Sequence, residues 1–477
     1  MAVSTSDSFD LVVRGGRLIT AGAEGFADVG VRGGRVVAIA DRLDDATEVI
    51  DAAGLLVLPG GVDAHCHMDQ PEYEGTRNCD DYFTGTRSAL CGGTTTVMTF
   101  TYQVKGRPIR EALADTLRRA AGRAAADYVP HLVVSDPSAA VLGQELPALI
   151  SSGFTSLKLF LTYDSLKVSD REILETLTVA KRGGALVMVH AENDASINWS
   201  TEQLKLAGRH GIENFADSRP GIAEREATHR ALALAELAGA PIYIAHVSTA
   251  GALGEISRAR ARGLPVYGET CPQYLLLTRQ DLDRPGFEAA KFMCCPPPRD
   301  RASQDALWHG LTSGTLQVAS SDHAPLLFDG ANGKQANGPQ AFFDRIPAGV
   351  PGIETRLPLL FSEGVNRGRM DLQRFVALTS TDPARLFGVF PKKGTIAIGS
   401  DADITIWDPG SQATIRNDRL HHACDYTPYE GRPITGMPVT TIMRGKTVWL
   451  DGIFSGEPGH GELLAAAMSS AYRNCRA

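Results

Sequence analysis

The sequence has few cysteines, and none has the spacing of a metal-binding or redox pair. Eight cysteines are scattered over 477 residues, only Cys294 and Cys295 are adjacent, and no Cys-x-x-Cys pair occurs. Scattered thiols in a long chain are typical of a reducing compartment. We therefore predict a cytoplasmic protein without a disulfide framework, in which most thiols are small buried apolar groups.

Long apolar runs and blocks of like charge are also missing. No stretch approaches the roughly 18 consecutive apolar residues of a membrane span, and the polar first ten residues lack the basic-then-apolar pattern of a signal peptide. The net charge of -8 disfavours nucleic acid and anionic membranes as partners. With 43% hydrophobic and 21% charged residues, the chain has the composition of a globular protein, and it is long enough for a large core.

The two ends of the chain share a pattern of β-branched runs interrupted by glycine. Four segments follow this pattern: 11–19, 29–37, 404–407 and 442–450. Such runs, broken by glycine-containing pairs, are typical of β-hairpins. We predict one small β-sandwich domain assembled from both termini, comprising residues 1–58 and 390–455.

Between these ends, apolar runs of strand length alternate with helical stretches. The eight runs end near His67, Phe100, Ser135, Phe160, His190, His246, Glu269 and Ser321. The helical stretches include 109–124, 170–182, 224–238, 251–262 and 371–387. This alternation predicts βαβ units, so we expect an α/β fold in which residues 59–389 form a TIM-like (β/α)₈ barrel. In the C-terminal tail, residues 456–477, the stretch 462–472 has the pattern of an amphipathic helix.

Five side chains of metal-binding type lie at the ends of predicted barrel strands. His65 and His67 are two residues apart on a strand, so both imidazoles face one side. His190, His246 and Asp322 each follow another apolar run. Barrel enzymes build their sites at the carboxyl ends of the strands, and imidazole is a common ligand for zinc and related ions. Any one of these residues alone is more often an ordinary buried polar group, but the five together predict a metal centre.

A lysine interrupts another apolar run. Lys158 lies in the run 156–161, where an unpartnered ammonium is expensive to bury. Desolvation lowers the pKa of an amine and makes it more nucleophilic. Such an amine can add carbon dioxide to give a carbamate, which binds metals as a carboxylate does. The residues alone leave a second interpretation open, in which Lys158 pairs with a nearby acid.

The order of these residues resembles the cyclic amidohydrolases of the hydantoinase and dihydropyrimidinase branch. The similarity runs from the N-terminal β segment to about Gly452. The motifs that carry it lie at residues 65–67, 92–96, 156–160, 190–193, 246–248, 268–275 and 321–325.

The resemblance implies two divalent metal ions, zinc in this family, bridged by a carboxylated Lys158. It places His65, His67 and Asp322 on one ion and His190 and His246 on the other. The implied reaction is hydrolysis of a C–N bond in a small cyclic amide, such as a hydantoin, a dihydropyrimidine or a cyclic imide. A metal-bridging hydroxide attacks, and Asp322 is general base and then acid. The resemblance also suggests a homotetramer.

Three further residues are expected at the substrate. Tyr163 lies five residues after Lys158, as in the hydantoinase pattern, and its hydroxyl is implied to hydrogen-bond the developing oxyanion. Cys295 and Ala348 stand where the family has Ser and Asn. If these two sites bind the ring mainly through backbone groups, the activity class is kept and the ring preference shifts. Residues 68–82 are predicted to form a lid that selects the ring substituent.

Two alternative functions stay open on the sequence. Allantoinase and dihydroorotase are sister activities, but Met68 and Asp69 replace the arginine that follows the His-x-His motif in dihydroorotases, and Tyr163 argues against allantoinase. The other alternative is a non-catalytic scaffold on the same fold, a class whose members have lost metal ligands. All six ligand positions are present here, which argues against a scaffold.

Overall fold

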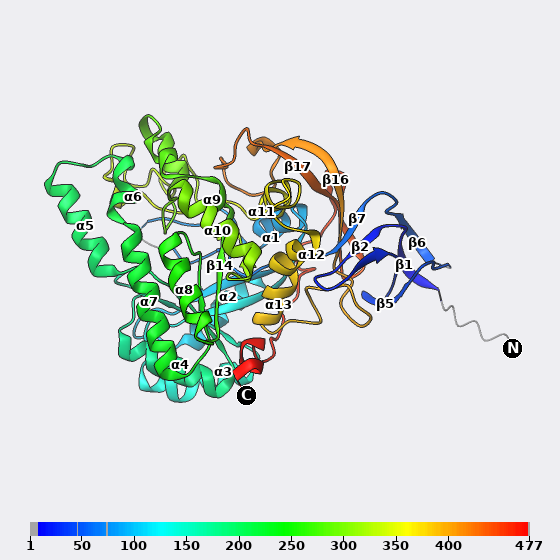
Figure 1. Ribbon diagram of the computed structural model, residues 1–477, viewed down its shortest axis with the longest axis horizontal. Coiled ribbons are helices and arrows are strands. Elements are labelled where there is room, and N and C mark those ends of the chain that lie inside the picture. The colour runs from blue at the N-terminus through cyan, green and yellow to red at the C-terminus, as the bar shows by residue number, and fades with distance from the viewer. Residues whose placement is uncertain (1–7, 45, 73–74, 476–477) are drawn as a thin grey trace.

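The apolar runs in the middle of the chain form one parallel sheet of eight strands (Figure 1). The structure is a computed structural model, and it describes residues 8–44, 46–72 and 75–475. In chain order the strands are β8 (Gly61–Asp63), β9 (Thr94–Tyr102), β10 (Asp127–Val133), β11 (Ser156–Phe160), β12 (Leu186–His190), β13 (Ile242–Ile244), β14 (Val266–Thr270) and β15 (Val318–Ala319). Each strand pairs with the next, and a parallel bridge between Cys66 and His323 joins the two ends of the sheet. The predicted (β/α)₈ barrel is therefore confirmed.

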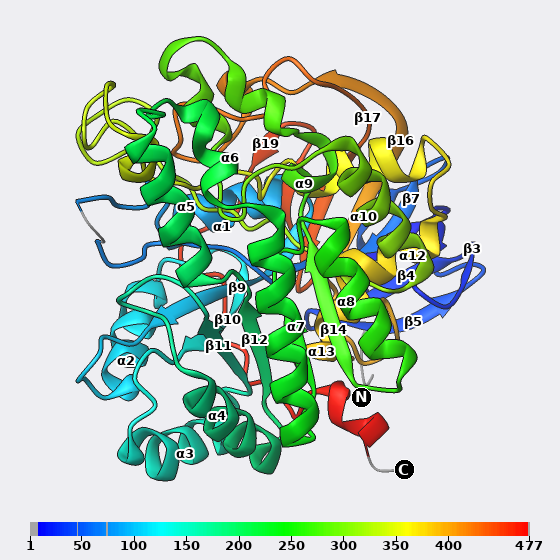
Figure 2. The same ribbon diagram turned by 60° about the vertical axis from the view of Figure 1, so that its left-hand side comes forward.

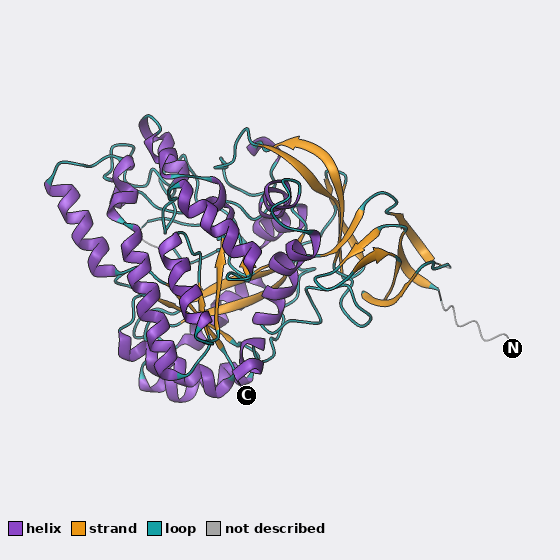
Figure 3. Cartoon of the chain, in the orientation of Figure 1, coloured by secondary structure: helices purple, strands orange, loops and turns teal. Residues whose placement is uncertain are grey.

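Helices wrap the outside of this barrel (Figures 2 and 3). Those between the strands are α1 (Tyr82–Cys91), α2 (Ile109–Ala120), α3 (Leu146–Ser151), α4 (Asp170–Gly183), α5 (Asp194–Leu206), α6 (Phe215–Ser218), α7 (Gly221–Ala238), α8 (Ala250–Ala261), α9 (Pro272–Leu276) and α10 (Arg301–Ser313). After β15 come α11 (Arg356–Leu360), α12 (Leu372–Val376) and α13 (Asp382–Leu386). Among the described residues, no helix is long and apolar enough to cross a membrane.

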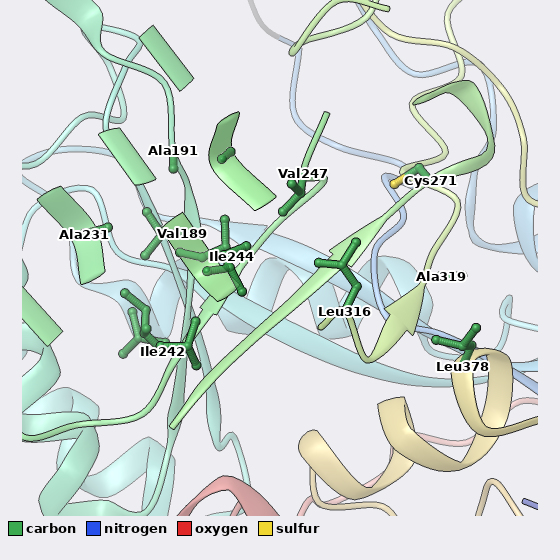
Figure 4. Close-up of a cluster of buried hydrophobic side chains, with 14 of the residues drawn as sticks. Val189, Ala191, Ala231, Ile242, Ile244, Val247, Cys271, Leu316, Ala319 and Leu378 are labelled. Carbon is green, nitrogen blue, oxygen red and sulfur yellow. The ribbon is translucent and has the colours of Figure 1, made fainter. Parts of the chain in front are cut away.

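Side chains along each barrel strand alternate between two buried layers. Val189 and Ile244 face outward and pack toward the surrounding helices together with Ala231 (Figure 4). Met188 and Tyr243, which neighbour them in sequence, belong to the separate cluster that fills the lumen. Because the side-chain period of a strand is two residues, a polar residue at a lumen position near a strand's carboxyl end is directed into the mouth of the barrel.

The C-terminal tail does not form the predicted amphipathic helix. Residues 462–469 form no helix, Leu463 bridges to Tyr128 at the start of β10, and only Ser470–Cys475 form a 3₁₀ helix. Leu464 and Ala466 are buried in the lumen cluster. The alanines favour a helix, but burial of every second side chain against the amino ends of the strands outweighs this propensity. The tail thus covers the end of the barrel opposite to the predicted site.

Strands from both ends of the chain form two further sheets beside the barrel, at the right of Figure 1. One has the order β5-β4-β1-β6 and consists of β1 (Phe9–Arg14), β4 (Asp28–Arg32), β5 (Arg35–Ala40) and β6 (Ala46–Asp51). The other has the order β19-β18-β17-β16-β7-β2-β3 and consists of β2 (Arg17–Ile19), β3 (Glu24–Phe26), β7 (Leu56–Pro59), β16 (Ile404–Thr414), β17 (Pro433–Met443), β18 (Lys446–Leu450) and β19 (Ile453–Phe454). Val13 and Val31 of the first sheet share a core with Ile442 of the second. This is the β-sandwich expected from both termini, and its exact boundaries stay a prediction.

Two of the expected hairpins are confirmed, and one is wrong. β4 pairs with β5 and β17 pairs with β18, both across two-residue turns with positive φ. β1 and β2 instead belong to different sheets. The chain crosses between the sheets at Gly16, where a Cβ atom would come within 2.4 Å of Val57. Gly16 therefore allows the two sheets to pack closely, and it does not form a hairpin turn.

Candidate metal centre

The carboxyl ends of β8 and β15 bring three of the predicted ligands together. Asp322 Oδ1 lies 3.2 Å from His65 Nε2 and 3.1 Å from His67 Nε2. One ligand atom from each of the three residues lies within 4.8 Å of the others. His65 and Asp322 are buried, and His67 is nearly so. Two imidazoles and a carboxylate in this arrangement form a set that suits a divalent cation.

His190 and His246 form a second pair beside the first group. His190 Nδ1 lies 2.9 Å from His246 Nε2, and the rings of His65 and His246 have centroids 5.3 Å apart, so the imidazoles form one continuous cluster. Burial lowers the pKa of both His190 and His246. Both rings are therefore neutral near pH 7, which is the protonation state that binds a metal ion.

Lys158 enters the same cluster from β11. Its neighbours Leu157 and Leu159 face the outer layer, so the lysine faces the lumen, where its Nζ lies 5.4 Å from the centre of the Phe100 ring and 5.2 Å from that of Phe160. Lys158 is 1% exposed. Burial lowers the pKa of this amine to about 8, although Glu269 and Asp322 oppose the shift. A fraction of the amine is therefore unprotonated near neutral pH.

Two nitrogens of the cluster fit a metal centre because they have no other partner. Lys158 Nζ and His246 Nδ1 are both buried, and neither makes a hydrogen bond within the described part of the chain. An unsatisfied buried polar group costs about 1–3 kcal/mol. For Lys158, the interpretation as one half of an ordinary ion pair is not supported by the contacts of the described residues. A carbamate on this nitrogen, held by cations, would remove the cost.

Three residues at the metal cluster have strained backbone conformations. Tyr163, His246 and Asp322 have φ values of 73°, 33° and 49°, in the left-handed region that residues other than glycine rarely adopt. Such a conformation costs on the order of 1–3 kcal/mol and persists where the surrounding structure enforces it, commonly at functional sites. The strain supports a functional role for Tyr163 independently of its side-chain contacts.

Tyr163 and Cys295 meet beside the second histidine pair. The Tyr163 ring centroid is 5.4 Å from that of His190, and the Cys295 thiol lies close enough to the Tyr163 hydroxyl to affect its pKa. Burial raises the pKa of Tyr163 well above its ordinary value, so the phenol keeps its proton. Ala348 is half-buried nearby: the amide of Gly349 donates to the Met293 carbonyl at 2.8 Å. The segment that contains Ala348 thus lies against the segment that contains Cys295.

Two acidic residues that the sequence analysis did not assign orient the histidines. Glu269, at the end of β14, accepts a hydrogen bond from His65 Nδ1, and its second oxygen accepts from Tyr243 and Ser320. Glu192 accepts from His190 Nε2 at 2.9 Å. Partners of this kind fix the tautomer of a metal-binding histidine. Both carboxylates follow apolar runs, and that position is the signal by which they could have been found.

A partly buried arginine connects Glu192 to Tyr163. Arg219 Nη1 donates to Glu192 Oε2 at 2.6 Å, and the guanidinium lies 5.3 Å from the centre of the Tyr163 ring. Arg219 lies in the connection between α6 and α7, where no periodic pattern marks a site. Sequence reasoning therefore had no signal for it.

The predicted lid starts at the metal cluster. Gln70 Nε2 lies 2.5 Å from His67 Nδ1, and the Tyr102 hydroxyl lies 3.2 Å from the same nitrogen. Farther along, the Cys79 amide donates to the Pro325 carbonyl at 2.9 Å. The described part of residues 68–82 therefore lies against the segment after Asp322. Its role in selecting substrates stays a prediction.

A second buried lysine holds the substrate segments together. Lys334 is 0% exposed, and its Nζ donates to the carbonyls of Met293 at 3.3 Å and Pro347 at 3.2 Å. These carbonyls precede Cys295 and Ala348. Burial lowers the pKa of Lys334 to about 8, since no carboxylate of the described residues pairs with it.

Lys334 gives a prediction for stability at alkaline pH. From about pH 8 to the ordinary lysine pKa of 10.5, the unfolded chain keeps a proton that the folded chain has released, so the free energy of unfolding rises with pH. We expect the wild type to gain stability relative to Lys334→Met across this window, with a constant difference below it. Urea unfolding at a series of pH values measures the difference, and exposed Lys446→Met is the control. Parallel curves for wild type and Lys334→Met would contradict the buried charge.

A parallel barrel with four histidines, a lysine and an aspartate gathered at its carboxyl end defines a metal-dependent barrel enzyme. The family model described as "Amidohydrolase family" matches residues 56–448. The chain therefore belongs to the amidohydrolase family, which generally binds divalent metal ions.

Within this family, the chain is similar in sequence and structure to hydantoinases and dihydropyrimidinases. The chain is 42% identical to a D-hydantoinase of Rhizobium radiobacter over 95% of this chain and 98% of the relative. It is 44% identical to a D-hydantoinase of Streptomyces coelicolor over 94% and 96% of the two chains. Among solved structures, a dihydropyrimidinase from Brevibacillus agri matches with a TM-score of 0.93 and 44% identity, covering 96% of this chain and 99% of the other. The hydantoinase and dihydropyrimidinase resemblance is thus confirmed.

Proposed function

We propose that this amidohydrolase hydrolyses a C–N bond of a small cyclic amide, opening a hydantoin or dihydropyrimidine ring. The observation that carries the proposal is the convergence of six side chains of metal-binding type with a strained, protonated Tyr163 at the mouth of the barrel. The names of the relatives support the choice of ring. The homotetramer and the cytoplasmic location remain predictions.

The residues of the cluster would hold two divalent ions, zinc in our proposal. His65, His67 and Asp322 would hold one ion, and His190 and His246 the other. Lys158 would add carbon dioxide and lose a proton, and the carbamate would join both ions. When bound, the ions lower the pKa of water and polarise the ring carbonyl.

Asp322 carries the proton in this proposal. Burial alone would raise the pKa of its carboxyl group, but the neighbouring imidazole of His65 and the hydrogen bonds from His65 and His67 hold it well below the usual range. The ionised carboxylate takes a proton from the attacking water and passes it to the ring nitrogen as the C–N bond breaks. One group thus acts first as base and then as acid.

Tyr163 and the two substrate segments would orient the ring. The Tyr163 hydroxyl donates a hydrogen bond to the oxygen that becomes negative when the carbonyl is attacked. Backbone groups at Cys295 and Ala348 would bind the ring amide, since neither side chain offers the polar groups of Ser or Asn. The Cys295 thiol influences the pKa of Tyr163, so a cysteine in place of Ser alters the surroundings of the proposed catalytic hydroxyl.

A substrate panel tests the proposed function. Zinc-loaded enzyme, prepared with bicarbonate, is assayed with both enantiomers of a 5-substituted hydantoin, dihydrouracil, a cyclic imide, allantoin and dihydroorotate. We expect a hydantoin or dihydrouracil to be opened with the highest kcat/KM. A higher kcat/KM for allantoin or dihydroorotate would mean that the enzyme is an allantoinase or a dihydroorotase instead. Fewer than one tightly bound metal ion per chain, with no turnover, would favour a scaffold.

Replacement of Tyr163 by Phe removes one hydroxyl from the proposed site. We expect kcat to fall by about 10²–10³-fold, the range for loss of one donor to an oxyanion, with a smaller change in KM because the ring remains. Steady-state kinetics on the best substrate measure both constants. Tyr472→Phe is the control, because it removes a buried tyrosine hydroxyl that donates to the Ala185 carbonyl at the opposite end of the barrel. Unchanged kcat in Tyr163→Phe would remove the residue from the mechanism.

A further inference from the structure

Two thiols meet outside the metal cluster. Cys79 Sγ lies 2.9 Å from Cys424 Sγ, although the residues are 345 positions apart in the sequence. Cys79 is partly exposed and Cys424 is buried, so a small reagent reaches the pair from the Cys79 side. Among the seven cysteines whose side chains the structure describes, these two form a direct sulfur–sulfur contact.

The backbone holds both cysteines in place. Asp80, next to Cys79, accepts a hydrogen bond from the amide of Ala423, next to Cys424, at 2.8 Å. The Cys79 amide donates to Pro325, and Cys424 Sγ lies 3.5 Å from the carbonyl oxygen of Leu326. The sulfurs are therefore brought together by bonds between their neighbours, so they do not depend on a chance contact of exposed side chains.

The contacts favour a covalent bond over a metal ion at this pair. Asp80 is the third group within ligand distance, but its oxygens already accept from His323 Nε2 at 3.1 Å and from Ala423. Tetrahedral zinc with Zn–S bonds of about 2.3 Å holds two sulfurs about 3.8 Å apart, farther than Cys79 and Cys424 are here. We propose that Cys79 and Cys424 form a dithiol site that hydrogen peroxide converts reversibly into a disulfide.

The chemistry balances with peroxide as the oxidant. The Cys79 thiolate attacks one peroxide oxygen, the O–O bond breaks, and the leaving hydroxide takes a proton to become water. The Cys424 sulfur then attacks the sulfenic sulfur of Cys79, the S–S bond forms, and the hydroxyl leaves with the Cys424 proton as a second water. Two thiols lose two electrons and peroxide gains them. A dithiol reductant reverses the bond by exchange.

The crosslink ties two regions of the barrel mouth. Cys79 belongs to the connection that begins at His67, and Cys424 to the connection between β16 and β17. Asp80, between them, bonds the His323 ring, and His323 follows Asp322 directly. A disulfide that joins distant parts of a chain restricts the unfolded state. We therefore expect the oxidised protein to melt at a higher temperature, by about 5 °C, and to lose metal to a chelator several-fold more slowly.

Mass spectrometry of the peroxide-treated, metal-loaded full chain tests the site. After free thiols are blocked, we expect a peptide pair linked through Cys79 and Cys424, a loss of two thiols per chain, and the upward shift in Tm, all reversed by dithiothreitol. Cys79→Ser and Cys424→Ser should lose the linked peptides and the shift, while the reduced variants stay folded as judged by far-UV circular dichroism. Cys91→Ser, which removes another buried thiol, should keep both.

Two results would overturn the proposal. One is oxidation of Cys79 to a sulfinic acid while Cys424 stays open to alkylation in the unfolded protein. The other is a bound metal ion in the reduced chain that disappears in Cys79→Ser while the His65–His67–Asp322 group stays loaded, because it would make the pair a metal site. Cys79→Ala repeats the test if the serine variant does not fold. None of these readouts depends on which ring the enzyme opens.

Discussion

Lys158→Ala should abolish ring opening, with kcat/KM lower by about 1,000-fold or more, since metal catalysis supplies several kcal/mol and each 1.4 kcal/mol is a factor of ten. Lys158 Nζ lies beside Phe100, which packs on His67, and Phe160, which packs on His190, and it makes no hydrogen bond within the described residues. Without it, nothing in the cluster joins the two proposed ions. Metal content, measured by elemental analysis, should fall with activity.

Rescue by a small acid separates the carbamate from other roles of this lysine. Alanine leaves a gap beside Phe100 and Phe160 that a short-chain carboxylic acid fits, and its carboxylate replaces the carbamate, so partial activity should return with its addition. Lys158→Met fills the gap with an apolar chain and should stay inactive with or without acid. Exposed Lys446→Ala is the matched control. Wild-type turnover in Lys158→Ala would contradict the bridging role.

The alternation of strand residues made the centre predictable from sequence. Lys158 lies between Leu157 and Leu159, which face the helices, so a period of two residues directs the lysine into the lumen. The same rule places His65 and His67 on one side of a strand end. His190, His246 and Asp322 were found because each follows an apolar run. Local pattern suffices where a regular strand carries the side chain to the site.

Residues held by long-range contacts carried no such signal. Arg219 and Lys334 lie in irregular connections, and their importance comes from partners far away in the chain, such as Glu192 and Pro347. The Cys79–Cys424 contact depends in the same way on how the connection after β8 meets the one after β16. No spacing of residues in the sequence predicts these long-range contacts.

Where the fold prediction was wrong, packing outweighed local preference. Alanines in the tail favour a helix, yet Leu464 and Ala466 are buried in a non-helical segment because the open end of the barrel offers apolar surface. Gly16 was interpreted as part of a turn, yet it serves a close approach of Val57. In both cases the deciding contact is made with a residue far away in the sequence. Helix propensity and turn patterns depend on neighbouring residues, so they could not predict it.

Asp322→Asn should lower kcat by about 10²–10⁴-fold, the usual contribution of general acid–base catalysis. Asparagine suits this test because Asp322 has a φ of 49°, and asparagine tolerates the left-handed region better than alanine does. The variant therefore keeps the backbone and an oxygen ligand while losing the ability to accept a proton. Asp418→Asn, at an exposed position, is the control.

Comparison of metal content with rate decides between the two roles proposed for Asp322. If the residue carries the proton, kcat collapses while most of the metal stays bound through His65, His67 and the amide oxygen. If it serves only as a ligand, activity falls in proportion to metal and returns when excess zinc is added. Full activity with full metal would exclude Asp322 from proton transfer altogether. Another residue would then have to act as the base. Glu192 is a poor candidate because its carboxylate already accepts hydrogen bonds from Arg219 and His190.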